Sequence, residues 1–205
     1  AEYLFCGPDV RSQRRGSLES WRDGVASMAT APMFLGLGVS FAGALLKPMG
    51  FNGFAVHICG DQGCGKSTAL ELASSVWQSP EHGQQWSATV NGLENVLAGF
   101  NDACCCMDEL GEFRGTRLDN IIYMIASGRG RARSDQTGTA NRPQKRWRGT
   151  LFSTGNVTAS QHTSEELHGG QSVRFIEIPV LANESTKSGA HADAVKRLTK
   201  ANYGY

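Results

Sequence analysis

The sequence predicts an α/β fold with a parallel central sheet. Short apolar segments of the kind that form buried strands alternate with segments whose apolar residues recur at helical spacing. A glycine-rich loop follows the first of these strands and precedes a helix. At 205 residues the chain has room for one well-filled domain of this class, but not for two large ones.

The overall composition is ordinary and points to no class of partner. Hydrophobic residues make up 40% of the chain, charged residues make up 19%, and the formal net charge is +1. The longest apolar stretch, Ala31 to Leu46, is shorter than the roughly 20 residues that a membrane-spanning helix needs, and it contains Pro32. No signal peptide opens the chain. We therefore expect no membrane association and a cytoplasmic location.

The cysteines are expected to be reduced thiols. No two pairs of them have the C-x-x-C spacing of a zinc site or a thioredoxin-like motif. Three are consecutive, Cys104 to Cys106, and neighbouring residues of a strand point to opposite faces, so these three cannot converge on one metal ion. Cysteine packs in a core as a small hydrophobe. The segment from Ala103 to Met107 is therefore predicted to be a strand buried on both faces.

Two helices are predicted before the first strand. Residues 18–28 have apolar side chains at helical spacing, with Ser17 placed to cap the helix, and residues 31–46 form the second helix. The next segment, FAVHIC at residues 54–59, is nearly continuous in apolar residues, as is typical of a strand buried in a parallel sheet. His57 within it is interpreted as a core residue.

The rest of the chain continues the alternation of strands and helices. Further strands are expected at residues 150–154 and 173–179. The remaining helices are expected at residues 66–77, from Asn91 with Glu94 at capping-box spacing, from Thr116 to a stop at Gly128, and at residues 191–201.

The strongest motif is the loop GDQGCGKS at residues 60–67, which matches G-x-x-x-x-G-K-[ST] in full. Its glycines let successive backbone N–H groups face an anion, and the following helix presents its positive N-terminal end. Lys66 would then reach the β- and γ-phosphates of ATP, and the hydroxyl of Ser67 would bind Mg²⁺. A glycine-rich turn with a chance lysine is the alternative. The predicted phosphate-binding residues are Gly60, Asp61, Gln62, Gly63, Cys64, Gly65, Lys66, Ser67 and Thr68.

An acidic pair follows the cysteine strand. Ligands of parallel sheets bind beyond the carboxyl ends of the strands, so Asp108 is expected near the loop and its Mg²⁺. Glu109 comes next, where it can polarise an attacking water as the catalytic base of NTP hydrolysis. A pair of surface acids is the alternative. Beyond the strand at 150–154, Asn156 is a candidate for orienting the water or sensing the γ-phosphate, although Ser-Thr-Gly-Asn is also good turn chemistry.

Residues 129–148 form a strongly basic segment, with seven arginines and lysines against one acid, Asp135. Turn-forming residues in its middle suggest two arms of a hairpin or loop, and Trp147 either stacks on a base or anchors an arm. A solvated face is the alternative to a nucleic-acid contact. The candidate DNA-binding residues are Arg131, Arg133, Lys145, Arg146 and Arg148.

Arg174 stands at the start of a predicted strand, where one subunit could lend it to the nucleotide of a neighbour as an arginine finger. A structural arginine at a strand edge is the alternative. Arg129, Arg131 and Arg133 compete with it for the role of finger.

Several segments, taken in order, resemble the ATPase domain known as domain of unknown function 927, found in phage- and plasmid-type primase-helicases and in helicases of mobile chromosomal cassettes. The segments are GDQGCGKSTALELASSVW, WSATVNGLENVLAGFND, MDELGE, IYMIASGRGRAR, WRGTLFSTGN, GGQSVRFIEIP and ANYGY. The resemblance covers essentially the whole chain, because it includes GSLESW and the helical layer before the glycine-rich loop. The resemblance implies a P-loop NTPase of the additional-strand catalytic-glutamate class, similar to AAA+ proteins. It also implies assembly into a homo-oligomer, with a hexameric ring around DNA as the expected form.

We expect three parts in the chain: an N-terminal helical layer packed on the core at residues 1–52, a P-loop ATPase core at 53–182, and a C-terminal helix that begins a truncated lid at 183–205. The leading hypothesis is an ATP-hydrolysing motor that translocates on DNA, with single-stranded DNA as the expected form, for replication of a mobile element. A regulatory P-loop switch that controls a protein partner is the alternative.

Overall fold

A parallel five-stranded sheet forms the centre of the computed structural model, which describes residues 14–115, 118–131, 133–134, 141–142, 144–161, 174–182 and 184–205. The strand order is β2-β3-β6-β1-β7, and every neighbouring pair is parallel. The prediction of a parallel α/β fold is confirmed. The strands are β1 (Phe54–Cys59), β2 (Gln84–Gln85), β3 (Cys104–Asp108), β6 (Thr150–Gly155) and β7 (Phe175–Pro179).

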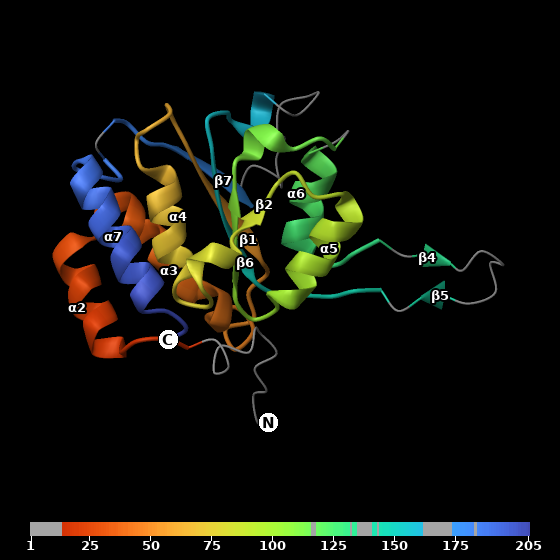
Figure 1. Ribbon diagram of the computed structural model, residues 1–205. Helices are drawn as coiled ribbons and strands as arrows, with labels where there is room; N and C mark the ends of the chain where they lie inside the picture. The colour runs from red at the N-terminus through yellow and green to blue at the C-terminus, as the bar shows by residue number, and fades with distance from the viewer. Residues whose placement is uncertain are drawn as a thin grey trace.

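Helices cover both faces of this sheet (Figure 1). On one side lie α2 (Leu18–Met28), α3 (Ala31–Leu45), α4 (Lys66–Ser74) and α7 (Gly189–Ala201), and on the other lie α5 (Val90–Gly99) and α6 (Leu118–Ser127). The buried apolar side chains form one cluster with each set of helices. Among the described residues, no helix has both the length and the apolar character needed to cross a membrane.

The cysteine run forms β3, as predicted. Cys104 and Cys106 belong to the core cluster of α3 and α4, whereas Cys105 and Met107 belong to the cluster of α5 and α6. All four side chains are buried, and burial raises the pKa of the Cys105 thiol well above its usual range. The cysteines that the structure describes are free thiols. They therefore fill the core as apolar groups.

Helix α3 packs unusually close to the sheet. A Cβ atom on Gly43 would lie 2.3 Å from the carbonyl oxygen of Ala103, and one on Gly36 would lie 2.8 Å from the ring of Phe152. Thr150 at the start of β6 donates its hydroxyl to the carbonyl oxygen of Val39 at 2.7 Å. The glycines of α3 and the small residues of β3 thus set the spacing between this helix and the sheet.

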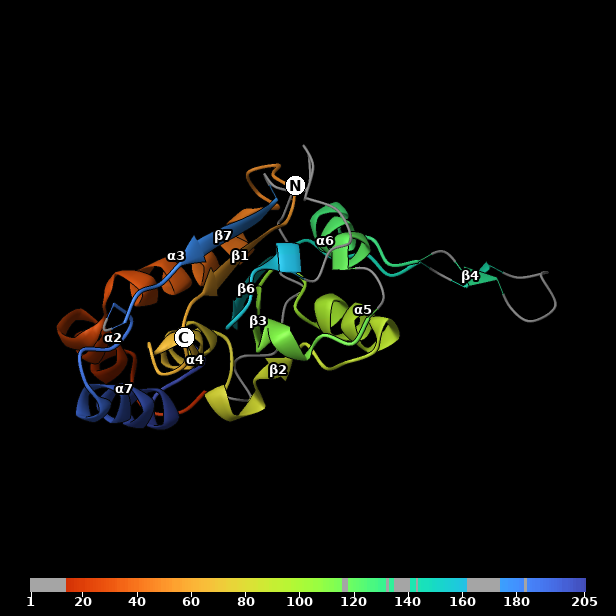
Figure 2. The ribbon, with the colours of Figure 1, turned by 90° about the horizontal axis from the view of Figure 1, so that it is seen from above.

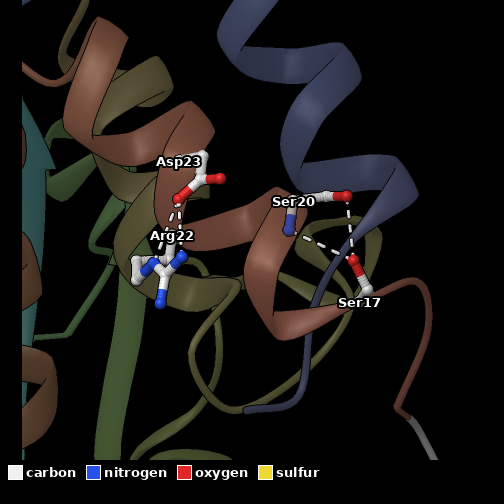
Figure 3. Close-up of polar contacts among 4 residues, drawn as sticks. All are labelled: Ser17, Ser20, Arg22 and Asp23. Atoms are coloured by element: carbon white, nitrogen blue, oxygen red, sulfur yellow. Dashed lines mark hydrogen bonds and ion pairs between the residues drawn. The ribbon is translucent and has the colours of Figure 1, made fainter.

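The N-terminal cap of α2 is the one predicted. The Ser17 hydroxyl accepts a hydrogen bond from the backbone N–H of Ser20 at 3.1 Å and contacts the Ser20 hydroxyl at 2.8 Å (Figure 3). Arg22 and Asp23 form an exposed ion pair on the same helix, which contributes little to stability (Figure 3). The buried indole of Trp21 then fastens α2 to the hydroxyl of Ser75, just after α4.

Three predicted helix boundaries are wrong. Helix α4 ends at Ser74 rather than near Trp77, because the chain turns into the core at Trp77, whose side chain is buried. The cap of α5 is Thr89, which accepts from the N–H of Gly92, and not Asn91. Glu94 faces the core instead of the helix end, and it accepts from the N–H of Arg131. Helix α7 begins at Gly189 because Ser188 caps it.

Gly128 ends α6 as predicted, in the left-handed conformation at φ 64°. Thr116, the predicted start of this helix, lies outside the described residues. The basic segment that follows contains two short antiparallel strands, β4 (Arg133–Ser134) and β5 (Asn141–Arg142), which project away from the body of the molecule (Figures 1 and 2). The hairpin interpretation is confirmed, and we call residues 129–148 the basic hairpin.

His57 lies at the centre of a buried polar network, as a core residue. Its Nδ1 contacts the Ser153 hydroxyl at 2.9 Å and its Nε2 contacts the carbonyl oxygen of Val157 at 2.9 Å. The Trp86 indole also donates to the Ser153 hydroxyl, at 2.8 Å. This pattern fits a neutral ring that carries its proton on Nε2. Burial lowers the pKa of His57 to about 4, and the nearby charge of Lys66 adds to this effect.

We expect stability to fall on acidification because of His57. Its folded-state pKa of about 4 lies below its unfolded value of 6.5, so its contribution is complete above pH 6.5 and is lost as the pH falls through 4. The loss is about 3 kcal/mol in free energy of unfolding. Urea unfolding between pH 7 and pH 4 checks this, with His57→Gln losing less on acidification. The exposed His82→Gln control should behave as the wild type, and equal pH dependence of all three proteins would contradict the assignment.

Candidate functional site

The residues predicted for the nucleotide site converge at the carboxyl ends of the parallel strands, which we call the carboxyl edge of the sheet. Strands β1 and β6 end together, since Cys59 pairs with Gly155 in the parallel register, and Met107 of β3 pairs with Ser153. The glycine-rich loop leaves β1, the acidic pair leaves β3, and Asn156 leaves β6. Three neighbouring strands therefore deliver polar groups to one place.

The glycine-rich loop requires its glycines for two different reasons. Gly63 and Gly65 have φ values of 84° and 90°, a conformation that side chains other than glycine rarely adopt. At Gly60, a Cβ atom would lie 2.2 Å from the carbonyl oxygen of Val180, which follows β7. Gly65 caps α4, so the loop turns its backbone directly into the N-terminus of that helix.

Lys66 is buried and folds into the loop. Its Nζ donates to the carbonyl oxygens of Gly60 at 2.9 Å and Asp61 at 2.8 Å, and to the side-chain oxygen of Asn156 at 3.0 Å. The sulfur of Cys64, which is also buried, lies 3.5 Å from the same nitrogen. The lysine therefore joins the loop after β1 to the residue after β6.

Asp108 is held in a fixed orientation at the end of β3. Its Oδ1 accepts from the hydroxyl of Thr154 on β6 and from the N–H of Glu109 at 3.0 Å. Glu109 itself has a φ of 56°, and a non-glycine residue in this region costs roughly 1–3 kcal/mol and is often found at functional sites. The sequence does not predict the contact from Thr154, because a strand pattern does not reveal which neighbour a side chain meets.

The network around His57 supports Asn156. The ring of His57 holds the carbonyl oxygen of Val157, the next residue along the chain, and the N–H of Ala159 donates to the Glu177 carboxylate at 2.5 Å. Both contacts tie the segment after β6 to strands β1 and β7. Asn156 is exposed but stands on a segment that these two contacts fix.

A cavity of about 420 Å³ lies where these groups meet. Its wall contains nine of the predicted site residues: Gln62, Gly63, Gly65, Lys66, Ser67, Thr68, Asp108, Glu109 and Asn156. Gly60, Asp61 and Cys64 belong to the loop but do not line the cavity. The exposed Ser67 hydroxyl and the Asp108 carboxylate are oxygen donors of the kind that Mg²⁺ prefers, and they face the same space. Among the described residues, no group of three or more His, Cys, Asp or Glu side chains is arranged to hold a metal ion.

Several residues near the C-terminus line this cavity although no sequence pattern predicts that they do. Thr186, the α7 cap Ser188, and Gly189 and Ala192 in the first turn of α7 line it. A Cβ atom on Gly65 would lie 2.6 Å from the hydroxyl of Thr186. Short polar stretches such as this one have no pattern that predicts a long-range contact.

Arg174 lies away from this cavity, at the amino ends of the strands, which we call the amino edge of the sheet. It precedes the first residue of β7, and its carbonyl oxygen accepts from the N–H of Ala55 near the start of β1. With Arg129 and Arg131 it lines a separate cavity of about 810 Å³. A strand of five residues spans about 17 Å, so Arg174 stands far from the loop of its own chain.

The basic hairpin also joins the amino edge of the sheet. Its arms begin after α6 and end at β6. The backbones of Arg129 and Arg146 form an antiparallel β-bridge across its base. Trp147 is buried among the side chains of α5 and α6, so it anchors the arm and is not placed to stack on a base. Arg131, Lys145 and Arg146 are exposed, and Arg148 is half-buried. The side chain of Arg133 lies outside the described residues.

The sequence model of the family described as domain of unknown function 927 matches residues 7–146. The chain belongs to this family.

The structural neighbours include "SCCmec type IV Cch - active helicase", with a TM-score of 0.74 and 26% sequence identity over 97% of this chain. The match covers 37% of that helicase, so the chain corresponds to little more than a third of it. The apo C-terminal region of NrS-1 is a weaker neighbour, with a TM-score of 0.46 and 12% identity over 98% of this chain and 48% of that one. Among curated proteins, none matches the chain.

The glycine geometry of this DUF927 member can be tested without reference to activity. Gly65→Ala forces a side chain into a φ of 90° and against Thr186, and we expect it to lower the free energy of unfolding by roughly 1–3 kcal/mol. The matched control is Gly38→Ala, at an exposed position of α3 with no atom within 4 Å of the new Cβ, which should raise the free energy of unfolding by roughly 0.5–1 kcal/mol. Denaturant unfolding measures both, and equal effects would contradict the described loop.

Proposed function

We propose that the chain is the ATP-hydrolysing motor domain of a helicase-type protein that translocates on single-stranded DNA during replication of a phage, plasmid or other mobile element. The observation that carries the proposal is the convergence of Lys66, Ser67, Asp108, Glu109 and Asn156 on one cavity at the carboxyl ends of three adjacent strands. Family membership and the 26% identical helicase neighbour support the same class of function.

The order of the strands supports a P-loop NTPase of the additional-strand catalytic-glutamate class, similar to AAA+ proteins. Strand β6 lies between β1, which carries the loop, and β3, which carries the acids. We place the ATPase core at residues 53–182, with residues 1–52 as a helical layer and residues 183–205 as a lid segment. Thr186 and α7 would then close the nucleotide site from the lid side.

The residues of the cavity suit a nucleoside triphosphate. The backbone N–H groups of the loop and the N-terminus of α4 would bind the phosphates, and Lys66 would exchange its carbonyl acceptors for phosphate oxygens. Ser67 and Asp108 would hold Mg²⁺, which would neutralise charge on the phosphates. Asn156 would orient the attacking water from the side of β6.

Glu109 is the group we assign as the general base. Its strained backbone directs the residue after Asp108 into the cavity, where its carboxylate can accept a proton from water. Its own backbone N–H fixes the Asp108 carboxylate. The two acids thus have separate roles, one in holding the metal and one in activating water.

Glu109→Gln should abolish most hydrolysis and leave ATP binding intact, because the amide keeps the shape but cannot take the proton. General-base catalysis typically contributes about 10²- to 10⁴-fold in rate. Single-turnover hydrolysis and equilibrium binding of a fluorescent ATP analogue measure the two effects. The control is Glu112→Gln, an exposed acid three residues away, which should hydrolyse ATP normally. Normal hydrolysis by Glu109→Gln would remove it from this role.

Arg174 would act on the nucleotide of a neighbouring copy in a homo-oligomer, for which a hexamer is the expected form. Its place at the amino edge, with Arg129 and Arg131, supports a role between subunits, because the site of its own chain lies at the other edge. Such an arginine typically contributes on the order of 10³–10⁵ in rate.

Mixing two inactive variants tests this arrangement. Arg174→Gln should hydrolyse ATP slowly, and so should Glu109→Gln, but a mixture should recover activity where a chain with an intact Glu109 meets a neighbour with an intact Arg174. With equal amounts and random assembly, about a quarter of the interfaces are competent. Steady-state ATPase rates measure the recovery. A mixture no more active than its components would place the finger elsewhere.

The basic hairpin would contact DNA through Arg131, Arg133, Lys145, Arg146 and Arg148. Strand β6 supports a route between chemistry and this contact, because the hairpin leads into its first residue and Asn156 follows its last. A displacement of Asn156 on loss of the γ-phosphate could therefore reach the hairpin through one continuous strand.

The test of the whole proposal is the ATPase rate against protein concentration, with and without single-stranded DNA. A motor with a finger between subunits should become faster per chain as concentration rises, and faster again with DNA. A rate that is indifferent to both would instead support the regulatory switch.

A further inference from the structure

A smaller cavity, of about 360 Å³, lies at the amino edge of the sheet beside the base of the basic hairpin. Its cationic side chains come from three separate segments: Lys47 after α3, Arg129 after α6, and Arg146 and Arg148 before β6. Asn52 and Asn101 add amide groups. No carboxylate is among the described residues that line the cavity. The wall therefore favours an anion.

The backbone that carries these cations is held in place. The N–H of Arg148 donates to the side-chain oxygen of Asn101 at 2.7 Å, and the carbonyl oxygen of Arg148 accepts from the N–H of Asp102 at 2.7 Å. The N–H of Trp147 donates to the carbonyl oxygen of Gly128 at 3.0 Å. The pocket is thus part of the rigid base of the hairpin and differs from its projecting arms.

Lys47 is held beside the cavity by a buried acid. It lies 3.8 Å from the carboxylate of Asp102, which is fully buried and is not among the wall residues, while 41% of the lysine side chain stays exposed. The ion pair with Asp102 therefore positions Lys47 and leaves part of its side chain accessible to a ligand.

We infer that this cavity binds a phosphate of the backbone of single-stranded DNA, with Lys47 and Arg129 as ligands in addition to the hairpin residues Arg146 and Arg148. The inference rests on the proposed DNA-translocating function. Charge continuity favours a polymer over a single nucleotide: residues 129–148 carry seven basic residues against one acid, so a strand seated here meets further cations along the hairpin.

The variants that test the pocket are Lys47→Gln and Arg129→Gln, and the probe is a labelled oligothymidylate bound to the 205-residue chain over a range of salt concentrations. Each should weaken binding by roughly tenfold, the effect of losing one charge-assisted hydrogen bond. Each should also lower the slope of log affinity against log salt by about 0.7, the value for one phosphate contact on a single strand. Arg197→Gln, an exposed residue of α7, is the charge-matched control and should bind as the wild type.

The outcomes separate this inference from the function on which it rests. If both variants bind as the Arg197→Gln control does, while joint neutralisation of Arg131 and Lys145 weakens binding, the pocket is overturned and the DNA-binding hairpin stands. If the wild type binds no oligothymidylate, both fail. If the variants bind DNA normally but lose the rise of ATPase rate with protein concentration, the pocket serves a neighbour's nucleotide and the inference is overturned. Two variants from different segments are used because Lys47 also faces buried Asp102.

Discussion

The pairing of β6 on both sides is the constraint on which the rest of this structure depends. This strand is fully buried and hydrogen-bonded in parallel to β1 and to β3, in a register that brings the ends of all three to the same edge. The register places Lys66, Asp108 and Asn156 within reach of one cavity. It also fixes the opposite edge, because the residues before these strands must gather there in the same order. The carboxyl edge therefore carries both acidic and basic side chains, whereas the cavity at the amino edge is lined by basic ones, and the parallel pairing of β6 keeps the two apart.

Much of the carboxyl edge could be predicted from the sequence, because its signals are local. The spacing of GDQGCGKS, the apolar run before Asp108 and the turn after β6 each identify a strand end, and parallel pairing brings strand ends together. What could not be predicted depends on contacts distant in sequence. Thr186 reaches the loop across more than a hundred residues, and Glu94 satisfies the backbone of Arg131 instead of capping its own helix. Neither contact has a local pattern, since only the packed fold decides which polar side chain meets an unsatisfied group.

The polar groups in the core show how the fold supports the site. His57, Ser153 and Trp86 are buried and satisfy one another, and the network ends on the carbonyl oxygen of Val157, beside Asn156. A buried network of this kind is stable only when every member finds its partner, so it permits a single position for the segment after β6. Strain at Glu109 is tolerated for a similar reason, because the Thr154 and backbone contacts to Asp108 hold the end of β3.

The three consecutive cysteines have a consequence that concerns distance and not thiol chemistry. Cys104 and Cys106 face the side of the sheet on which α3 rests, and α3 approaches so closely that Gly43 leaves no space for a methyl group beside Ala103. Side chains larger than cysteine on this face of β3 would lift the helix and break its contact with Thr150, the first residue of β6. The distance between α3 and β3 therefore affects the position of β6, the strand that runs from the amino edge to the carboxyl edge. Small volume, a property that alanine or serine shares, is what these positions select.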